Sequence, residues 1–244
     1  MRLPRPEMIL IDLDGTLVDS VPDLTYCVDA MQRELGLPER GEDAVRTWVG
    51  NGVERLVERA LCNDLDGVPE PEQMARALPV FMHLYQSNTS QRSVLYPGVR
   101  EGLEALRAQG FKLGCVTNKA ERFTLPLLRD KGIHDYFALV ISGDSLERRK
   151  PDPAPLLHAA QYFQVAPERS LMVGDSRSDV RAARAAGFAI VCMSYGYNHG
   201  ADIRLEHPDL VLDRLDALPA VFSNTDGDTD AATRSLSTPG HRGA

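Results

Sequence analysis

Cysteine is scarce in this sequence and does not occur in pairs. The 244 residues include four cysteines that lie far apart, with no CxxC pair among them. Zinc sites and disulfide frameworks need closely spaced or paired cysteines, so we expect reduced thiols that are mostly buried. The four are Cys27, Cys62, Cys115 and Cys192.

Long apolar runs are also lacking. No stretch approaches the roughly 20 apolar residues that a membrane-spanning helix needs. Near the start, the apolar run Met8–Ile11 ends at Asp12, whereas a secretory signal needs roughly 7–15 apolar residues. We therefore expect no membrane segment, no leader and a cytoplasmic location.

Basic residues are outnumbered by acidic ones, 27 against 35, which leaves a net charge of −8. Such a chain has no electrostatic reason to bind nucleic acid or an anionic membrane. A small anionic ligand would have to be attracted locally, by a metal ion, a lysine or backbone amides. The hydrophobic fraction of 43% is ordinary for a globular protein with a sizeable core. The composition leaves a monomer and a homodimer equally open.

After a first apolar, strand-like run near its start, the chain alternates strand-like runs with helical segments from about residue 97 onward. This order predicts an α/β fold built on a mostly parallel, doubly wound sheet. The predicted strands are Met8–Asp12, Leu113–Thr117, Leu139–Ser142, Leu171–Gly174 and Ile190–Met193. The predicted helices are Gly98–Gln109, Glu121–Lys131, Pro153–Phe163 and Ser178–Ala186.

Residues 21–92 differ from this pattern, because their apolar residues recur at helical spacing and no strand is evident. We interpret them as a helical domain inserted into an α/β core made of residues 1–20 and 93–222. Pro79 is expected to kink or split the last inserted helix. Residues 223–244 are rich in Ser, Thr, Asp and Gly, and we predict that they are disordered.

The first predicted strand ends in the motif Asp12-Leu13-Asp14-Gly15-Thr16. On an extended backbone Asp12 and Asp14 project to the same side, where two carboxylates repel unless a cation joins them or one keeps a proton. Ligands of open parallel sheets bind beyond the carboxyl ends of the strands. A surface turn is the alternative reading. An EF-hand is excluded, because Leu17 and Asp23 stand where its loop requires Gly and Glu.

Three further strand ends carry complementary polar groups. Thr117 and Asn118 offer a hydroxyl and an amide, Lys150 offers a cation, and Asp175 and Asp179 offer two carboxylates. Each group alone is equally consistent with a helix cap or a turn. Four such groups at the ends of four elements of one sheet predict a shared site instead.

These motifs resemble those of the haloacid dehalogenase superfamily, and the resemblance extends from Met8 to about Phe222. The helical insertion is similar to that superfamily's cap domain, and we call residues 21–92 the cap. Several segments are similar to bacterial phosphoglycolate phosphatases in particular. These segments are Asp19–Leu24, Trp48–Gly52, Gly174–Arg177 and Tyr195–Asn198.

The resemblance implies a Mg²⁺-dependent phosphatase in which Asp12 is the nucleophile and forms an aspartyl-phosphate. It implies that Mg²⁺ is held by the side chains of Asp12 and Asp175 and by the backbone carbonyl of Asp14. The Asp14 carboxylate is then expected to act as general acid and base. Superfamily dehalogenases generally lack this second aspartate, so its presence favours phosphoryl transfer.

Further roles follow from the same resemblance. Lys150 and Thr117 are expected to bind the transferring phosphoryl oxygens, with Asn118 as another donor to substrate. Asp179 is expected to organise the surroundings of the metal rather than to bind it.

The expected substrate is a small phosphorylated metabolite of carbohydrate metabolism, with 2-phosphoglycolate favoured and glycolate as its product. The amides of Gly50 and Asn51, near the start of a cap helix, are candidates to bind its carboxylate; a simple helix cap is the alternative. Phosphatases of sugar or amino-sugar phosphates and phosphosugar mutases share these motifs and stay open. A binding protein that lost catalysis is disfavoured, because no motif residue is missing.

Overall fold

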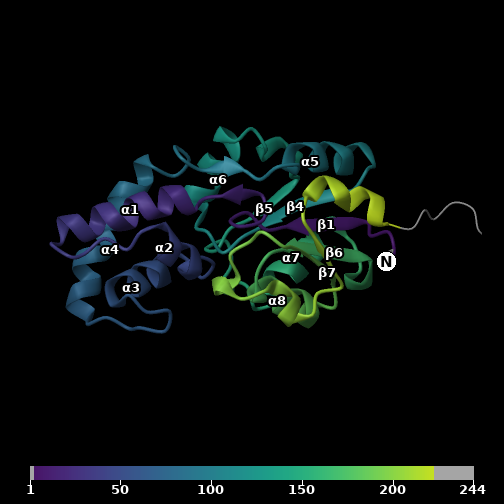
Figure 1. Ribbon diagram of the computed structural model, residues 1–244. Coiled ribbons are helices and arrows are strands. Elements are labelled where there is room, and N and C mark those ends of the chain that lie inside the picture. The colour runs from purple at the N-terminus through teal and green to yellow at the C-terminus, as the bar shows by residue number, and fades with distance from the viewer. Residues whose placement is uncertain (1–2, 223–244) are drawn as a thin grey trace, which may run out of the picture.

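The computed structural model describes residues 3–222, and the predicted disorder of residues 223–244 lies outside them. In this part of the chain six parallel strands form one sheet in the order β5-β4-β1-β6-β7-β8 (Figure 1). This confirms the doubly wound α/β fold predicted from the sequence. The strands are β1 (Met8–Ile11), β4 (Lys112–Val116), β5 (Leu139–Ile141), β6 (Ser170–Gly174), β7 (Ala189–Met193) and β8 (Leu210–Leu212).

The central strand β1 determines where a site can form. The chain first adds strands on one side of β1 and then returns to add the others on the opposite side, so the strand order reverses at β1. Crevices that bind ligands open at such reversal points, beyond the carboxyl ends of the strands. Asp12 directly follows β1, and Thr117 and Asp175 directly follow the neighbouring strands β4 and β6.

Every residue of β1 is fully buried, because helices cover both faces of the sheet. Ile9 and Ile11 belong to a hydrophobic cluster with α5 and α6, whereas Met8 and Leu10 belong to a cluster with α7 and α8. Alternate side chains thus point to opposite layers. The helices are α5 (Val99–Ala108), α6 (Glu121–Asp130), α7 (Ala154–Phe163) and α8 (Arg177–Ala186).

The cap consists of helices that lie beside the sheet and surround a hydrophobic cluster of their own (Figure 1). Two core residues, Phe123 and Tyr197, also belong to this cluster, so the cap packs directly against the core. Over residues 3–222, no helix combines the length and the apolar character that a membrane span requires. The cap helices are α1 (Val21–Glu34), α2 (Glu42–Trp48), α3 (Val53–Cys62) and α4 (Pro71–Ser87).

Three features differ from the sequence prediction or were missed by it. Helix α4 continues through Pro79 as one helix, so Pro79 does not split it, and the alternative, a kink, stays a prediction. Pro79 is exposed, and water can therefore solvate the carbonyl that lacks its usual amide partner. A separate two-stranded sheet and the last strand of the main sheet were not predicted, because their strands are only two or three residues long. They are the antiparallel pair β2 (Val18–Asp19) and β3 (Val94–Leu95), where the chain enters and leaves the cap, and β8.

Candidate active site

Three buried aspartates meet at the carboxyl edge of the sheet. Asp12, Asp175 and Asp179 each offer a carboxylate oxygen, and these oxygens lie within 4.8 Å of one another. Burial raises the pKa of Asp12 to about 7, opposed by Lys150 and reinforced by Asp179. Burial, and next the charges of Asp179 and Asp12, likewise raise the pKa of Asp175. A hard divalent cation with oxygen ligands would relieve this repulsion, so the residues fit Mg²⁺.

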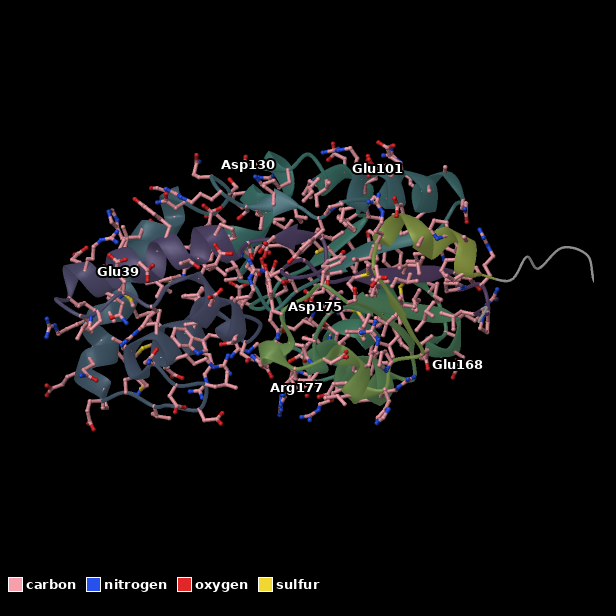
Figure 2. All side chains as sticks on the ribbon, viewed as in Figure 1. Glu39, Glu101, Asp130, Glu168, Asp175 and Arg177 are labelled. Carbon is pink, nitrogen blue, oxygen red and sulfur yellow. The ribbon has the colours of Figure 1, made fainter. Side chains whose placement is uncertain are left out.

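Asp175 is held by groups from two distant segments. Its Oδ1 accepts a hydrogen bond from Thr16 Oγ1 at 2.8 Å, and its Oδ2 accepts one from the backbone amide of Tyr197 at 2.8 Å. Two glycines leave room for the carboxylate: a Cβ at Gly15 or Gly196 would lie 2.4 Å or less from an Asp175 atom. Gly15 also has a φ of +87°, which glycine adopts at little cost. Figure 2 shows Asp175 near the junction of the cap and the sheet.

Asp179 already has protein donors on both oxygens. Its Oδ2 accepts hydrogen bonds from the backbone amides of Asp175 and Ser176 and from Ser176 Oγ, which caps the start of α8. Its Oδ1 accepts from Lys150 Nζ at 2.7 Å. These contacts suit a residue that orients the turn and the lysine. The expectation that Asp179 organises the surroundings of the metal without binding it stays a prediction.

Lys150 is the cation of this cluster and is only 3% exposed. Its Nζ lies 2.7 Å from Asp179 Oδ1, 2.7 Å from the carbonyl oxygen of Val116 and 2.9 Å from Asp12 Oδ1. Burial disfavours the charge, but Asp12 and Asp179 outweigh it and raise the pKa of Lys150. The ammonium donates hydrogen bonds to Asp179 and to the Val116 carbonyl oxygen and forms an ion pair with Asp12, whose charge it offsets.

Thr117 and Asn118 follow β4 and line the same pocket. Thr117 Oγ1 accepts a hydrogen bond from the amide of Lys119 at 3.2 Å, which leaves its own proton available to a ligand. Asn118 Nδ2 donates to the carbonyl oxygens of Gly50 at 3.1 Å and Lys150 at 2.9 Å. Both amide protons therefore have protein acceptors, and Asn118 links the cap to the core. Its expected donation to the substrate stays a prediction.

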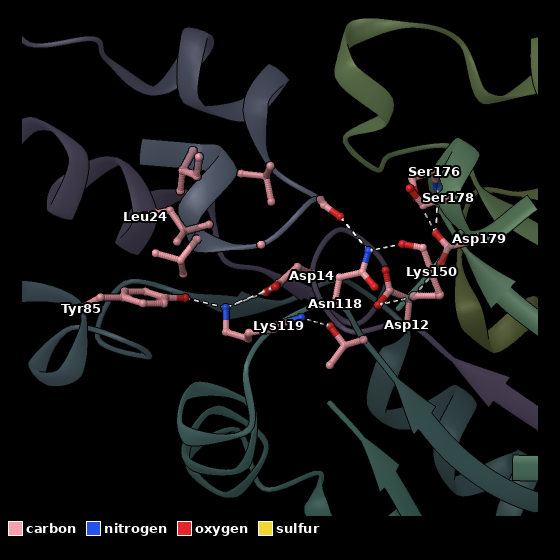
Figure 3. Close-up of a pocket in the computed structure, with 16 residues that line it drawn as sticks. Asp12, Asp14, Leu24, Tyr85, Asn118, Lys119, Lys150, Ser176, Ser178 and Asp179 are labelled. Atoms are coloured by element: carbon pink, nitrogen blue, oxygen red, sulfur yellow. Dashed lines mark hydrogen bonds and ion pairs between the residues drawn. The ribbon is translucent and has the colours of Figure 1, made fainter. Parts of the chain in front are cut away.

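A pocket of about 530 Å³ lies between the cap and this cluster (Figure 3). Its core side is polar and contains Asp12, Asp14 and Lys150. Gly50 lines it, whereas its neighbour Asn51 does not, so only one of the two expected cap residues faces the cavity. The cap side is largely apolar and consists of Leu24, Val49, Gly50, Gly52, Val53, Leu56 and Tyr85.

Lys119 was missed at the sequence level. Its Nζ lies 3.1 and 3.2 Å from the two carboxylate oxygens of Asp14 and 2.5 Å from the hydroxyl of Tyr85 in α4 (Figure 3). Burial alone would lower the pKa of Lys119, but Asp14 and Tyr85 outweigh it and raise the pKa. Its position directly after Thr117 and Asn118 could have marked it as a site residue, but its partner Tyr85 lies in the cap, 34 positions earlier in the sequence.

Comparison with known proteins agrees with these motifs. A model of the haloacid dehalogenase-like hydrolases matches residues 6–187. A phosphoglycolate phosphatase of Nitrosococcus oceani is 64% identical over 213 residues, which cover 87% of this chain and 95% of that protein. One of Pseudomonas putida is 50% identical over 214 residues, which cover 87% and 78% respectively.

A solved structure leads to the same family. The crystal structure of a predicted phosphoglycolate phosphatase from Haemophilus somnus superposes with a TM-score of 0.83 at 37% identity, covering 88% of this chain and 97% of that one. The resemblance inferred from the motifs is thereby confirmed. This chain belongs to the haloacid dehalogenase-like hydrolases.

Proposed function

We propose that this chain is a Mg²⁺-dependent phosphatase that hydrolyses 2-phosphoglycolate to glycolate and phosphate. The observation that carries the chemistry is the buried set of Asp12, Asp175 and Asp179 with Lys150, located where β1 meets the cap pocket. The substrate is supported by relatives named phosphoglycolate phosphatase at 46–64% identity over most of the chain.

In the proposed first step a carboxylate oxygen of Asp12 attacks phosphorus. The new bond forms an aspartyl-phosphate, the bond from phosphorus to the glycolate oxygen breaks, and that oxygen takes a proton from Asp14. Mg²⁺, held by the side chains of Asp12 and Asp175 and the carbonyl of Asp14, would neutralise charge on the phosphoryl oxygens. Lys150 and the hydroxyl of Thr117 stabilise the same oxygens.

The second step regenerates the enzyme. Asp14 takes a proton from water as the water oxygen attacks phosphorus, and the bond between phosphorus and Asp12 breaks, which releases phosphate. The cap side of the pocket covers the substrate during the first step and limits access of bulk water.

The direct test is phosphate release from 2-phosphoglycolate and from a panel of sugar and amino-sugar phosphates, with Mg²⁺ and with EDTA. We expect Mg²⁺-dependent turnover with the highest kcat/KM for 2-phosphoglycolate. A higher kcat/KM for another phosphate would keep the chemistry but refute the substrate, and transfer of phosphate to a second position of a sugar would indicate a mutase.

The Asp12→Asn variant tests the nucleophile. It should lose turnover by at least about 10³-fold, since the amide cannot attack phosphorus, while its circular dichroism spectrum stays that of the wild type. Near-normal activity in a folded Asp12→Asn protein would contradict the mechanism.

A further inference from the structure

The pocket contains a second cation whose position differs from that of Lys150. Among the described residues that line the pocket, the positively charged ones are Lys119 and Lys150. Lys150 lies beside Asp12 and Asp179, whereas Lys119 lies on the side of Tyr85 and the cap (Figure 3). A ligand that spans the pocket therefore meets one cation at each end.

The two lysines also differ in the number of carboxylates beside them. Lys150 donates hydrogen bonds to the Val116 carbonyl oxygen and to Asp179 and forms an ion pair with Asp12, so two carboxylates offset its charge. Lys119 donates to both oxygens of Asp14 and to the Tyr85 hydroxyl, so a single carboxylate offsets its charge. At 6% exposure it is poorly solvated, so an anionic group in the pocket is a favourable additional partner.

The wall around Lys119 explains why the cation is needed there. Leu24, Val53 and Leu56 offer no hydrogen bonds to a ligand, and they line the pocket on the cap side. A carboxylate placed against such a wall without a cation would lose its hydration without compensation. Arg149, another cation of this region, lines an adjacent pocket instead.

We propose that Lys119, fixed by Asp14 and Tyr85, binds the carboxylate of the substrate and selects for short phosphomonoesters that carry a second anionic group. This inference rests on the proposed phosphatase activity and specifies its substrate class. It assigns the carboxylate to a side chain at the end of β4, in addition to the backbone of the cap loop around Gly50. The phosphoryl group occupies the other end, beside Asp12 and Lys150.

The test compares two unreactive inhibitors, so that binding is separated from the role of Asp14 in the reaction. 3-Phosphonopropionate has the length of 2-phosphoglycolate and keeps its carboxylate, whereas propylphosphonate ends in a methyl group. Inhibition constants are measured against hydrolysis of p-nitrophenyl phosphate in wild type, Lys119→Met, Lys119→Arg and the control Lys112→Met. Lys112 is exposed at the start of β4, at the opposite end of the strand.

In Lys119→Met we expect inhibition by 3-phosphonopropionate to weaken about 30-fold or more, the scale on which truncating one partner of a buried charge pair acts. Inhibition by propylphosphonate should change less than about 3-fold, Lys119→Arg should recover part of the loss, and Lys112→Met should match wild type. If both inhibitors weaken equally, or neither does, Lys119 does not bind the carboxylate and the proposal is refuted.

Two further outcomes keep the proposals separate. If wild type prefers 3-phosphonopropionate through Lys119 but does not hydrolyse 2-phosphoglycolate, the substrate assignment fails and the anion site stands. If Lys119→Met does not fold, Tyr85→Phe provides the same test, because it removes one of the groups that fix the ammonium. It should weaken 3-phosphonopropionate several-fold and leave propylphosphonate unchanged, and equal effects on both would refute the site.

Discussion

At the scale of single residues, the central feature is the charge balance around Asp12. Asp12, Asp175 and Asp179 are at most 9% exposed, and Lys150 forms ion pairs with Asp12 and Asp179. Three buried carboxylates beside one ammonium leave net negative charge, which is costly in a poorly solvated site. In the function proposed above, a divalent cation would offset this charge.

This charge balance predicts how the stability of the metal-free protein depends on pH. An unfolded aspartate titrates near 3.9, whereas the folded pKa of Asp12 is raised to about 7. Between these values the folded state binds more protons than the unfolded state, so stability falls as pH rises. In EDTA, the melting temperature should drop by several degrees from pH 5 to pH 7.5, as measured by differential scanning fluorimetry.

Mg²⁺ should oppose this trend, because it binds the ionised carboxylates and stabilises the folded state more at pH 7.5 than at pH 5. The Asp12→Asn variant is the control, since it removes the main titrating group and should show a flatter profile in EDTA. A melting temperature that rises between pH 5 and 7 in the metal-free wild type would contradict the assignment.

Thr16 supports the metal site through one hydrogen bond. It is fully buried, and its hydroxyl donates to Asp175 Oδ1 at 2.8 Å. Thr16→Val keeps the shape but removes the donor, so the Mg²⁺ concentration for half-maximal activity should rise about 10–100-fold. Thr47→Val, which loses a bond to the backbone of its own cap helix, should leave that concentration unchanged. Equal values in the two variants would show that the Thr16 contact does not tune the metal.

At the scale of elements, Asp23 joins the two places where the chain passes between core and cap. It lies in the first turn of α1, is fully buried, and accepts hydrogen bonds from the amides of Arg92 and Ser93 and from Ser93 Oγ at 2.6–3.0 Å. These partners directly precede β3. One carboxylate therefore holds the entry and the exit of the cap together.

Asp23→Ala should lower the free energy of unfolding by about 3 kcal/mol, since it leaves two backbone amides and a hydroxyl without their acceptor. Urea denaturation measures this loss. Asp43→Ala, at an exposed position of α2, should change stability by less than about 0.5 kcal/mol. A similar small effect for Asp23→Ala would mean that other contacts hold the cap connections.

At the scale of the whole molecule, the pocket exists only because the cap packs on the core. Asn118 contributes through its bond to Gly50, and His199 Nδ1 contacts the carbonyl oxygen of Thr47 at 2.8 Å. These contacts connect loops of the core to the end of α2 and to the segment between α2 and α3. Their loss should loosen the cap without unfolding the sheet.

We therefore expect Asn118→Ala to lower kcat/KM for 2-phosphoglycolate at least about 10-fold and to increase hydrogen exchange in residues 49–53. The global free energy of unfolding should fall by only about 1–2 kcal/mol. The control Asn88→Ala, just after α4, loses bonds to Leu84 and Arg92 away from residues 49–53 and should leave both quantities unchanged. If exchange in residues 49–53 is unaffected, Asn118 does not hold the cap.

Local patterns in the sequence were sufficient to predict the fold class and most strands of the sheet. A buried parallel strand is an uninterrupted apolar run, as in Met8–Ile11, and polar residues directly after such runs lie at the ligand-binding edge. Asp12, Thr117 and Asp175 could be identified on this basis because each directly follows a strand. The shortest strands gave no such signal, since two or three apolar residues also occur in loops.

Only the tertiary structure determined the contacts between residues that are far apart in the sequence. The sequence alone determined the α/β fold, the family and the aspartates at the strand ends. It did not show that Lys119 meets Tyr85, or that Asn118 bonds to Gly50. The physical reason is that strand ends are set by local hydrophobic pattern and chain direction, whereas these pairs form only when the cap packs against the core.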